Sequence, residues 1–481
     1  MFFSSITFAE RINNFVNVAN DQLWGWVLIY VLIGAGLYFT ISTKFVQFRY
    51  IKEMFGLLTE KETLSTEGKK TISSFQAFTI SAASRVGTGN LAGVATAIAG
   101  GGPGAVFWMW IIALIGSASA FIESTLAQIY KVKDDSGAFR GGPAYYMEKG
   151  LNKRWLGIIF AVIIMICFGL IFNSIQSNTI ALAMEEAAGV QPELVGIVLA
   201  VITGIVIFGG IHRIAILSQA IVPVMAIIYI LVAIFVLLTN ITQIPAMISL
   251  IVESAFGLRE VVSGGMGAAI MFGIKRGLFS NEAGMGSAPN AAATATVSHP
   301  AKQGFIQSLG VFFDTILICS ATAFIIILSG VYTNPELDGI QLTQNALGEF
   351  VGAVGAPFLA VLIFLFAFSS IVGNYYYGET NLEFIRNNKV ALTLYRLAVI
   401  GMVYYGTTQP LQSVWNMGDL FMAIMALINI LAIVLLGRIA IAALKDYTNQ
   451  RKQGKNPVFY ADSIPNLPNV EAWEKKPTSQ K

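Results

Sequence analysis

The chain has 481 residues, of which 55% are hydrophobic and only 12% charged, and its mean hydropathy is +0.68. A water-soluble domain carries about a quarter of charged residues, so this composition excludes a soluble protein and predicts a membrane protein. The formal net charge of +3 is spread without a basic block interleaved with aromatic residues, which excludes a typical nucleic-acid-binding chain.

Apolar runs of roughly 20 residues, the length needed to cross about 30 Å of hydrocarbon, recur from Trp24 to Arg438 with short connections. We predict an all-α, polytopic membrane protein with eleven transmembrane helices. The spans fall near residues 24–43, 74–100, 103–130, 155–184, 192–211, 214–239, 264–297, 304–330, 355–380, 391–408 and 411–437. Short amphipathic segments are expected between them, near residues 49–58, 143–150, 244–256 and 341–351.

This pattern divides the chain into three parts. Residues 1–23 are predicted to form an extracellular segment, residues 24–445 a single transmembrane domain, and residues 446–481 a polar, partly disordered cytoplasmic tail. The first span is expected to be retained, because no basic segment and no signal-peptide cleavage site precedes it. Cys167 and Cys319 lie within apolar runs, so neither disulfide bonds nor a metal cluster is expected.

Lysine and arginine are distributed unequally between the two sides of the membrane. When the connections are assigned to alternate sides, 23 of the 30 basic residues fall on one side, and only Arg11 and Arg259 fall on the other. The remainder lie inside or at the edges of spans, namely Arg85, Lys275, Arg276, Arg396 and Arg438. Because cytoplasmic loops carry the excess of positive charge, we predict an extracellular N-terminus and a cytoplasmic tail in a bacterial or archaeal plasma membrane.

Spans 2 and 7 contain glycine-rich interruptions, Arg85–Leu91 and Asn281–Asn290, whose glycine pairs are 197 positions apart. The spacing predicts a repeated unit of five spans, with one copy at about 74–240 and the other at about 264–445. Because five is an odd number, the two copies cross the membrane in opposite directions. Spans 2–11 are therefore predicted to form a 5+5 inverted repeat in which spans 2 and 7 are discontinuous.

An interrupted helix leaves peptide groups unpaired, and each such group in lipid costs several kcal/mol unless it is buried in protein or lines an aqueous cavity. At paired interruptions, helix N-termini can present amides to an anion, while freed carbonyl groups can coordinate a cation. The carboxylate of an amino-acid zwitterion would suit the amides, and a sodium ion would suit the carbonyl groups. Glycines that only permit close helix packing are the alternative, which is weaker for two interruptions at matched positions.

Charged side chains inside spans need partners, because an isolated charge is costly in hydrocarbon. Arg85 and Glu282 lie beside the two interruptions, Asp314 lies in span 8, and Asp419 lies in span 11. For Asp314 and Asp419, a role at an ion site and a structural hydrogen bond to a neighbouring helix both remain open.

The segment Gly101–Gly116, at the start of span 3, resembles the signature of the sodium:alanine symporters, the alanine or glycine:cation symporter family, over all sixteen residues. Gly141–Met147 and Asn281–Asn290 also resemble that family, and the likeness covers about residues 20–445. It implies the inverted-repeat fold of the leucine transporter, with span 1 as an addition. It also implies a sodium-coupled symporter that imports a small neutral amino acid, alanine or glycine, by alternating access.

A local resemblance to the leucine transporter implies individual site residues. The amides of Thr88 and Gly89 would bind the substrate carboxylate, and Phe279 would be an aromatic gate. The substrate-binding residues implied or nominated in this way are Thr88, Gly89, Asn173, Gln176, Phe279, Gly284 and Met285. A first sodium ion would be bound by Asn90, Ser280 and Asp314, and a second by Ala83, Val86, Phe366, Ser369 and Ser370.

Two departures from the leucine transporter matter. Gly93 stands where an arginine would form an outer gate, so any outer gate must be built differently. A polar cluster in span 4, which includes Asn173 and Gln176, replaces an expected tyrosine. Because a polar Gln176 would also suit a carboxamide, glutamine is a serious alternative substrate.

Other function classes are less well supported. An ion channel is possible, although neither interruption resembles a repeated carbonyl filter. The chain has neither an HExxH nor a GxSxG motif, so we do not expect an enzyme. His212 and His299 lie at span ends and are expected to be solvated. The oligomeric state is left open.

Overall fold

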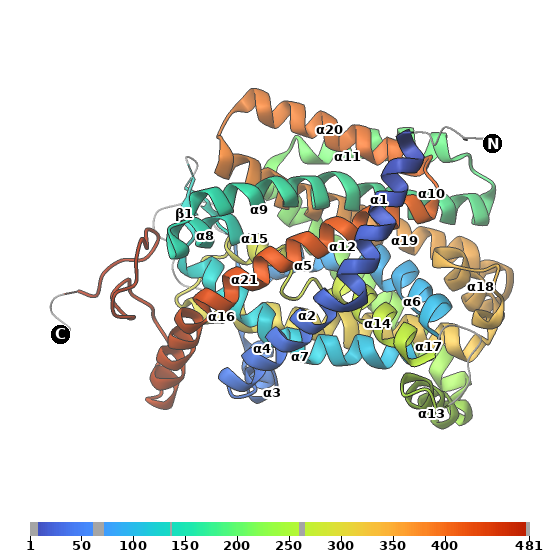
Figure 1. The fold of residues 1–481 in the computed structure, drawn as a ribbon, viewed down its shortest axis with the longest axis horizontal. Helices are drawn as coiled ribbons and strands as arrows, with labels where there is room; N and C mark the ends of the chain where they lie inside the picture. The colour runs from blue at the N-terminus through green and yellow to red at the C-terminus, as the bar shows by residue number, and fades with distance from the viewer. Residues whose placement is uncertain (1–7, 61–71, 135–136, 259–264, 478–481) are drawn as a thin grey trace, which may run out of the picture.

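The computed structural model describes residues 8–60, 72–134, 137–258 and 265–477, and most of them are helical (Figure 1). The predicted all-α class is therefore confirmed. Residues 1–7 of the expected extracellular segment lie outside the described residues, as do several residues of the charge count, among them Lys61 and Arg259.

The elements follow one another in a single helical series. The helices of the first half are α1 (Phe8–Gln22), α2 (Leu28–Ser42), α3 (Val46–Arg49), α4 (Ile51–Leu58), α5 (Ser74–Arg85), α6 (Val94–Gly101), α7 (Gly104–Ile129), α8 (Pro143–Leu151), α9 (Arg154–Ile166), α10 (Asn173–Ala188), α11 (Pro192–Ile207) and α12 (Gly210–Thr239). Those of the second half are α13 (Ile244–Ala255), α14 (Gly265–Asn281), α15 (Ala288–Ala292), α16 (Pro300–Val311), α17 (Ser320–Ser329), α18 (Gly339–Val351), α19 (Gly355–Ile385), α20 (Lys389–Thr407) and α21 (Leu411–Lys452). Strands β1 (Val132–Lys133) and β2 (Phe139–Arg140) form an antiparallel pair. The π-helical stretches are Leu23–Val27, Gly89–Gly93, Cys167–Phe172 and Phe312–Cys319.

Local chemistry sets several helix boundaries. A capping box begins α5, because the Ser73 hydroxyl accepts from the Gln76 amide at 3.1 Å and the Gln76 side chain accepts from the Ser73 amide at 3.0 Å. Proline occupies the first turn of α8 and α11. Backbone N–H groups in the first turn have no acceptor within the helix, so proline, which lacks an N–H, costs no hydrogen bond there. Gly189, with φ of 63°, ends α10 in the left-handed conformation that glycine tolerates.

Eight helical segments among the described residues are long and apolar enough to cross a membrane, so this is a multi-pass membrane protein. Predicted span 5 corresponds to α11, which is a shorter apolar helix. Predicted spans 2 and 7 do not appear among the eight, because each is divided into pieces that fall below the length needed. The short amphipathic segments predicted between spans are confirmed as α4, α8, α13 and α18.

Both predicted interruptions are present. The first separates α5 from the π-helical stretch at Gly89, and the second separates α14 from α15. In the second, Gly284 and Gly286 have φ of 81° and 88°, a region that glycine adopts without strain, and Glu282 has φ of 58°. The glycines thus allow the chain to leave the helix and re-enter it within a few residues.

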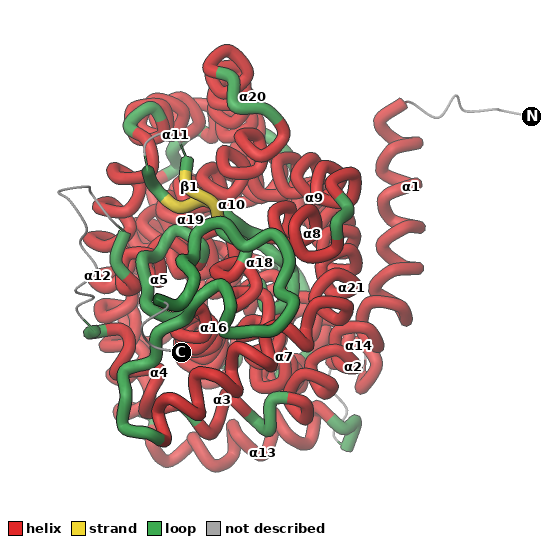
Figure 2. The backbone as a smooth tube through the Cα atoms, turned by 90° about the vertical axis from the view of Figure 1, so that its left-hand side faces the viewer, coloured by secondary structure: helices red, strands yellow, loops and turns green. Residues whose placement is uncertain are grey.

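The two ends of the bundle are built differently. In Figure 1, α13 and α18 lie toward the right-hand end, whereas α8, β1 and the C-terminal segment lie at the left-hand end. Figure 2 looks onto that left-hand end, where many helices are seen end-on and loops cross the middle of the bundle. The two-stranded hairpin and the amphipathic α8 therefore belong to the same end as the C-terminus.

The expectation of a partly disordered tail is wrong for residues 453–477. Helix α21 continues through Lys452, and the segment after it packs back onto the bundle. The amide of Phe459, a buried residue, donates to the Ser298 carbonyl at 2.9 Å, and Trp473 Nε1 donates to the Gln128 carbonyl at 2.9 Å. The aromatic side chains in this polar segment find an apolar surface at the end of the bundle.

His299 is also not solvated as expected. Its ring is buried between Tyr447 and Phe459, and its Nε2 lies 3.2 Å from Asp446 Oδ2. Burial lowers the pKa of His299 below its ordinary value, although the hydrogen bond to Asp446 opposes this shift. The other histidine, His212, is partly exposed at the start of α12.

Candidate functional site

The side chains predicted for a first sodium ion converge beside the two interruptions. Asn90 Nδ2 donates to Asp314 Oδ1 at 2.7 Å, and the Ser280 hydroxyl donates to Asp314 Oδ2 at 2.8 Å. All three residues are fully buried. They come from two π-helical stretches and the end of α14, so three elements distant in sequence supply one cluster. π-helical turns are frequent at functional sites.

The chemistry of this cluster fits a hard cation. Asp314 offers two carboxylate oxygens and Ser280 a hydroxyl oxygen, while the Asn90 amide oxygen accepts from the Gly87 amide at 2.9 Å. Thr315, which was not predicted, donates to Asp314 Oδ2 at 2.9 Å. The sulfur of Cys319, which was also not predicted for this site, lies 3.2 Å from the Ser280 hydroxyl. Oxygen ligands of this kind suit sodium.

The residues predicted for a second sodium ion also meet. The Ser370 hydroxyl donates to the Ala83 carbonyl at 2.8 Å, and it also lies 3.1 Å from the Phe366 carbonyl. The Ser369 hydroxyl is 2.9 Å from the same Phe366 carbonyl. Val86, buried at the end of α5, lies one turn after Ala83. Helix α19 therefore packs Ser370 against the first interruption, whereas the Ser369 hydroxyl lies 3.8 Å from Met225 Sδ of α12.

Thr88, Gly89, Gln176 and Phe279 lie together, as predicted for a substrate pocket. The Gln176 side-chain oxygen accepts from the Thr88 amide at 2.9 Å. A Cβ atom added at Gly89 would lie 3.0 Å from the Phe279 ring, so any other residue there would require its neighbours to shift. Asn173 turns away from them, because its Nδ2 donates to the Gly169 carbonyl of its own helical turn at 3.0 Å.

Gly284 and Met285 lie at the second interruption, where sequence reasoning missed the principal side chain, Glu123 of α7. The Glu123 carboxylate accepts from the Gly284 amide at 3.0 Å and from the Gly286 amide at 3.1 Å. Asn429 of α21 donates to both Glu123 Oε2, at 2.8 Å, and the Gly284 carbonyl, at 2.9 Å. Protein side chains thus already satisfy the Gly284 backbone. A single acidic residue within the apolar span 3 was the signal that could have found Glu123.

A second carboxylate links the two interruptions to each other. Glu282 accepts from the Ser84 hydroxyl at 2.7 Å and from the Ser287 hydroxyl at 2.5 Å. Ser84 directly precedes Arg85, whose buried guanidinium donates from Nη1 to the Gln307 carbonyl at 3.3 Å. The two interruptions are therefore joined by a direct hydrogen bond between side chains.

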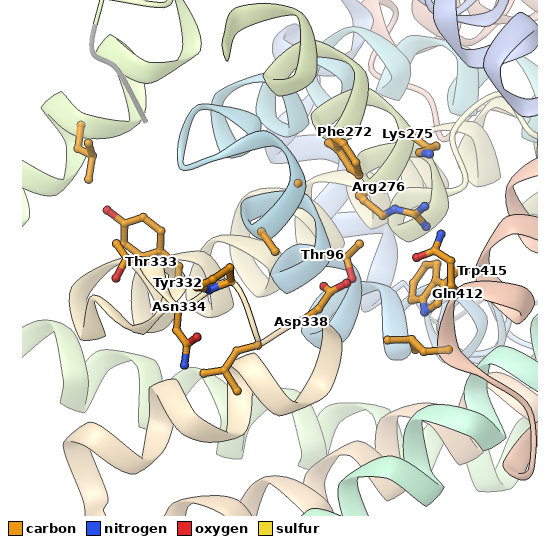
Figure 3. Close-up of a pocket in the computed structure, with 16 residues that line it drawn as sticks. Thr96, Phe272, Lys275, Arg276, Tyr332, Thr333, Asn334, Asp338, Gln412 and Trp415 are labelled. Atoms are coloured by element: carbon orange, nitrogen blue, oxygen red, sulfur yellow. The ribbon is translucent and has the colours of Figure 1, made fainter. Parts of the chain in front are cut away.

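A cavity of about 570 Å³ lies above this site, between α6, α14, the loop before α18, and α21 (Figure 3). Figure 3 shows Arg276 and Lys275 on one wall, Trp415 and Gln412 on another, and Thr96 beside Asp338. Arg276 Nη2 lies 2.6 Å from Asp419 Oδ2, and Lys275 Nζ lies 3.1 Å from the same oxygen. Asp419, left open by the sequence, is therefore the partner of two cations from α14.

An aromatic layer lies beneath this ion pair. The Arg276 guanidinium is 4.4 Å from the centroid of the Trp415 ring, and the Phe279 ring is 4.6 Å from Trp415 and 4.7 Å from Phe172, both between centroids. These side chains separate the cavity from the cluster at Asp314. A Cβ atom added at Gly93 would lie 3.6 Å from the Trp415 ring, so Gly93 and Arg276 both lie beside this ring.

The chain resembles known transporters over nearly its whole length. The model of a family described as the sodium:alanine symporter family matches residues 9–461. The amino-acid carrier protein AlsT of Bacillus subtilis is 61% identical, and the alignment covers 96% of this chain and 98% of AlsT. A "probable sodium/glutamine symporter GlnT" of the same organism is 55% identical, with 96% of each chain covered.

A solved structure shows the same fold at low sequence identity. The manganese transporter of Eremococcus coleocola superposes with a TM-score of 0.53 at 13% identity, covering 80% of this chain and 88% of the transporter. At that identity the likeness is one of fold alone.

The ion pair beneath the cavity predicts unequal effects of two single substitutions. Asp419→Asn leaves Lys275 and Arg276 without their carboxylate, whereas Arg276→Gln leaves one cation paired with Asp419. Because breaking a buried ion pair costs about 3–5 kcal/mol when a charge is left unpaired, Asp419→Asn is expected to lower the melting temperature of the purified protein clearly more than Arg276→Gln. Equal melting temperatures for the two variants would contradict this assignment.

Proposed function

This chain belongs to the sodium:alanine symporter family, and on that premise we propose that it imports a small neutral amino acid together with sodium by alternating access. The observation that carries the proposal is the convergence of Asn90, Ser280 and Asp314 at the point where two interrupted helices meet. The oxygen atoms of these side chains would bind sodium, and the adjacent amides of Thr88 and Gly89 would bind the amino-acid carboxylate.

We further propose that spans 2–11 form the 5+5 inverted repeat, within eleven spans. The two interrupted helices support this, since α5 and α6 occupy the start of the first unit and α14 and α15 the start of the second. An odd number of spans in each unit would direct α5 and α14 into the bilayer from opposite sides. Two related halves that meet at one site suit a carrier that exposes the site to each side in turn.

Gln176 would act as a placeholder for the substrate. In the structure, its side-chain oxygen accepts a hydrogen bond from the Thr88 amide. That amide is the group proposed to bind the substrate carboxylate. A carboxylate would replace this neutral acceptor with a charged one, and charge-assisted hydrogen bonds are roughly twice as strong as neutral ones. The released Gln176 amide would then face the side chain of the bound amino acid.

The arrangement favours a carrier over a channel. The cavity is lined by Arg276 and Trp415 but by none of Asn90, Ser280 and Asp314, so it does not pass through the proposed ion site as a pore. At the opposite end, Ile72 pairs with Ala295 next to the residues that contact the C-terminal segment. The site would therefore open to the side of the cavity first, through movement of the Arg276–Asp419 pair.

Alanine or glycine is the proposed substrate, and glutamine is the second candidate. The family to which the chain belongs is named for alanine, and the compact site, with Phe279 against Gly89, favours a small side chain. The second candidate rests on Gln176 and on the 55% identity to a relative whose printed name specifies glutamine.

The proposed sodium sites predict the effect of three substitutions. Asn90→Ala, Asp314→Ala and Ser370→Ala are each expected to weaken apparent sodium affinity tenfold to hundredfold, since a charge-assisted contact contributes roughly 1.5–3 kcal/mol. Asn90→Ala and Asp314→Ala are expected to weaken amino-acid affinity as well. Sodium dependence of uptake into proteoliposomes measures both effects. Thr179→Ala, a buried hydroxyl bonded only within α10, is the control. Normal sodium dependence in all three variants would place the ion sites elsewhere.

The substrate is decided by competition. If alanine is carried, bulky amino acids should fail to compete for its uptake, and Met285→Gly should admit larger ones while alanine uptake persists. If glutamine is carried, Gln176→Leu should reduce glutamine uptake more than alanine uptake. A buried polar group of the substrate that loses its hydrogen-bond partner is rejected far more strongly than a substrate that differs by one methylene, which is worth about 1–3 kcal/mol. Equal competition by leucine, phenylalanine and alanine would defeat both versions.

Sidedness is predicted by the charge bias, with the C-terminus in the cytoplasm of a plasma membrane. A cysteine introduced at Lys149 of α8 is expected to be protected from an impermeant thiol reagent in whole cells, and one at Pro335 is expected to react. The native Cys167 and Cys319 are both buried, so their background reaction should be low. The opposite labelling pattern would reject the orientation.

A further inference from the structure

A second cavity lies where α2 meets the end of α21, far along the chain from the ion cluster. It is a groove of about 320 Å³ between the turn that follows α2 and residues 441–452 at the end of α21. Four basic side chains line it, Lys44, Arg49, Lys445 and Lys452, and no carboxylate of the described residues lines it. All four side chains are exposed to solvent, and their combined positive charge favours the binding of an anion.

The fold holds these cations in one place. Lys445 and Lys452 are two turns apart on α21, so they share a face of that helix. The Arg49 guanidinium donates to the Lys44 carbonyl at 3.2 Å, which fixes Arg49 above the turn. The Tyr50 hydroxyl lies 3.2 Å from the Thr448 hydroxyl and joins the two walls of the groove.

The turn itself is unusual. Lys44 and Phe45 both have positive φ angles, 56° and 60°, which non-glycine residues adopt at a cost of about 1–2 kcal/mol each. The Phe45 amide donates to the Thr40 carbonyl at 2.7 Å, which holds the turn closed. The chain thus maintains a strained turn that sets Lys44 at the edge of the groove.

Nearby carboxylates are committed elsewhere. Asp446 contacts His299 at 3.2 Å, and Glu53 accepts from Arg451 at 2.8 Å. Asp446 lies on another face of α21, and Glu53 lies on α4. Within the described parts of the chain, none of the four groove cations forms an ion pair.

The exposed apolar side chains beside the groove favour a lipid over a free anion as its ligand. Ile41, Phe45 and Phe48, on or beside the same turn, expose 65%, 51% and 44% of their surface, respectively. Cations next to a wide exposed apolar surface match a molecule that has a phosphate at one end and hydrocarbon at the other. Basic pockets at the cytoplasmic ends of membrane helices bind lipid headgroups in this way.

We propose that this groove binds the phosphate headgroup of an anionic phospholipid of the cytoplasmic leaflet, with the acyl chains along the exposed face of α2. The phosphodiester oxygens would accept hydrogen bonds from Lys44, Arg49, Lys445 and Lys452. The assignment to the cytoplasmic leaflet rests on the proposed orientation, whereas the assignment of the ligand does not. The lipid would join the helix of the first span to the last helix of the bundle.

The test is a lipid titration of the purified full chain in neutral detergent, followed by its melting temperature. Phosphatidylglycerol is expected to raise the melting temperature, and phosphatidylcholine is not. Lys445→Gln with Lys452→Gln should weaken the apparent phosphatidylglycerol affinity about thirtyfold, at roughly 1 kcal/mol for each lysine. Lys445→Arg with Lys452→Arg keeps the charge and should retain the affinity.

A matched control removes the same charge elsewhere, through Lys475→Gln with Lys476→Gln in the C-terminal segment, and should respond to lipid as the unaltered protein does. Equal loss in the groove variant and this control would overturn the proposal. If inorganic phosphate at the same concentration raised the melting temperature equally, the ligand would be a free anion, and the proposal of a lipid would be overturned. Sodium and amino acid are absent from these measurements. Failure of the transport proposal would therefore leave the lipid result unchanged, and failure of the lipid proposal would leave the transport result unchanged.

Discussion

The peptide groups freed at the two interrupted helices must find partners, because a buried N–H or C=O without one costs several kcal/mol in a membrane. At the first interruption, Asn90 accepts from the Gly87 amide and Gln176 from the Thr88 amide. At the second, Glu123 accepts from the amides of Gly284 and Gly286. Each partner comes from a side chain rather than from the helix itself.

This requirement explains why so many elements meet at one place. Gln176 comes from α10 and Glu123 from α7, while Asn429 reaches the Gly284 carbonyl from α21. Ser84 and Glu282 then join one interruption directly to the other. The polar groups are buried in protein rather than in lipid, so the cost of removing them from water is offset by their mutual hydrogen bonds. The same groups are the ones that a substrate or a cation would compete for.

The two ends of the molecule differ in what covers this centre. On one side lies an open cavity, closed beneath by the Arg276–Asp419 ion pair and the Trp415 and Phe279 rings. On the other side, the C-terminal segment crosses the bundle and buries Phe459 against the residues around His299. The centre is therefore covered by different structures on its two sides.

Several features were determined by the sequence alone. Composition fixed the membrane class, glycine spacing located both interruptions, and the oxygen-bearing Asn90, Ser280 and Asp314 could be assigned to one cluster from the resemblance to a known fold. The first two features are local, because hydrophobic length and glycine content act through the backbone near each residue. The cluster joins residues distant in sequence, and it could be predicted only through the resemblance. Tertiary structure alone decided which distant side chains complete the site. Glu123, Thr315 and the pairing of Arg276 with Asp419 depend on which helix faces lie together, and the packing of Phe459 depends on an apolar surface made by other segments. A single sequence does not contain those distances, because they arise only when helices far apart along the chain bury their polar groups against one another.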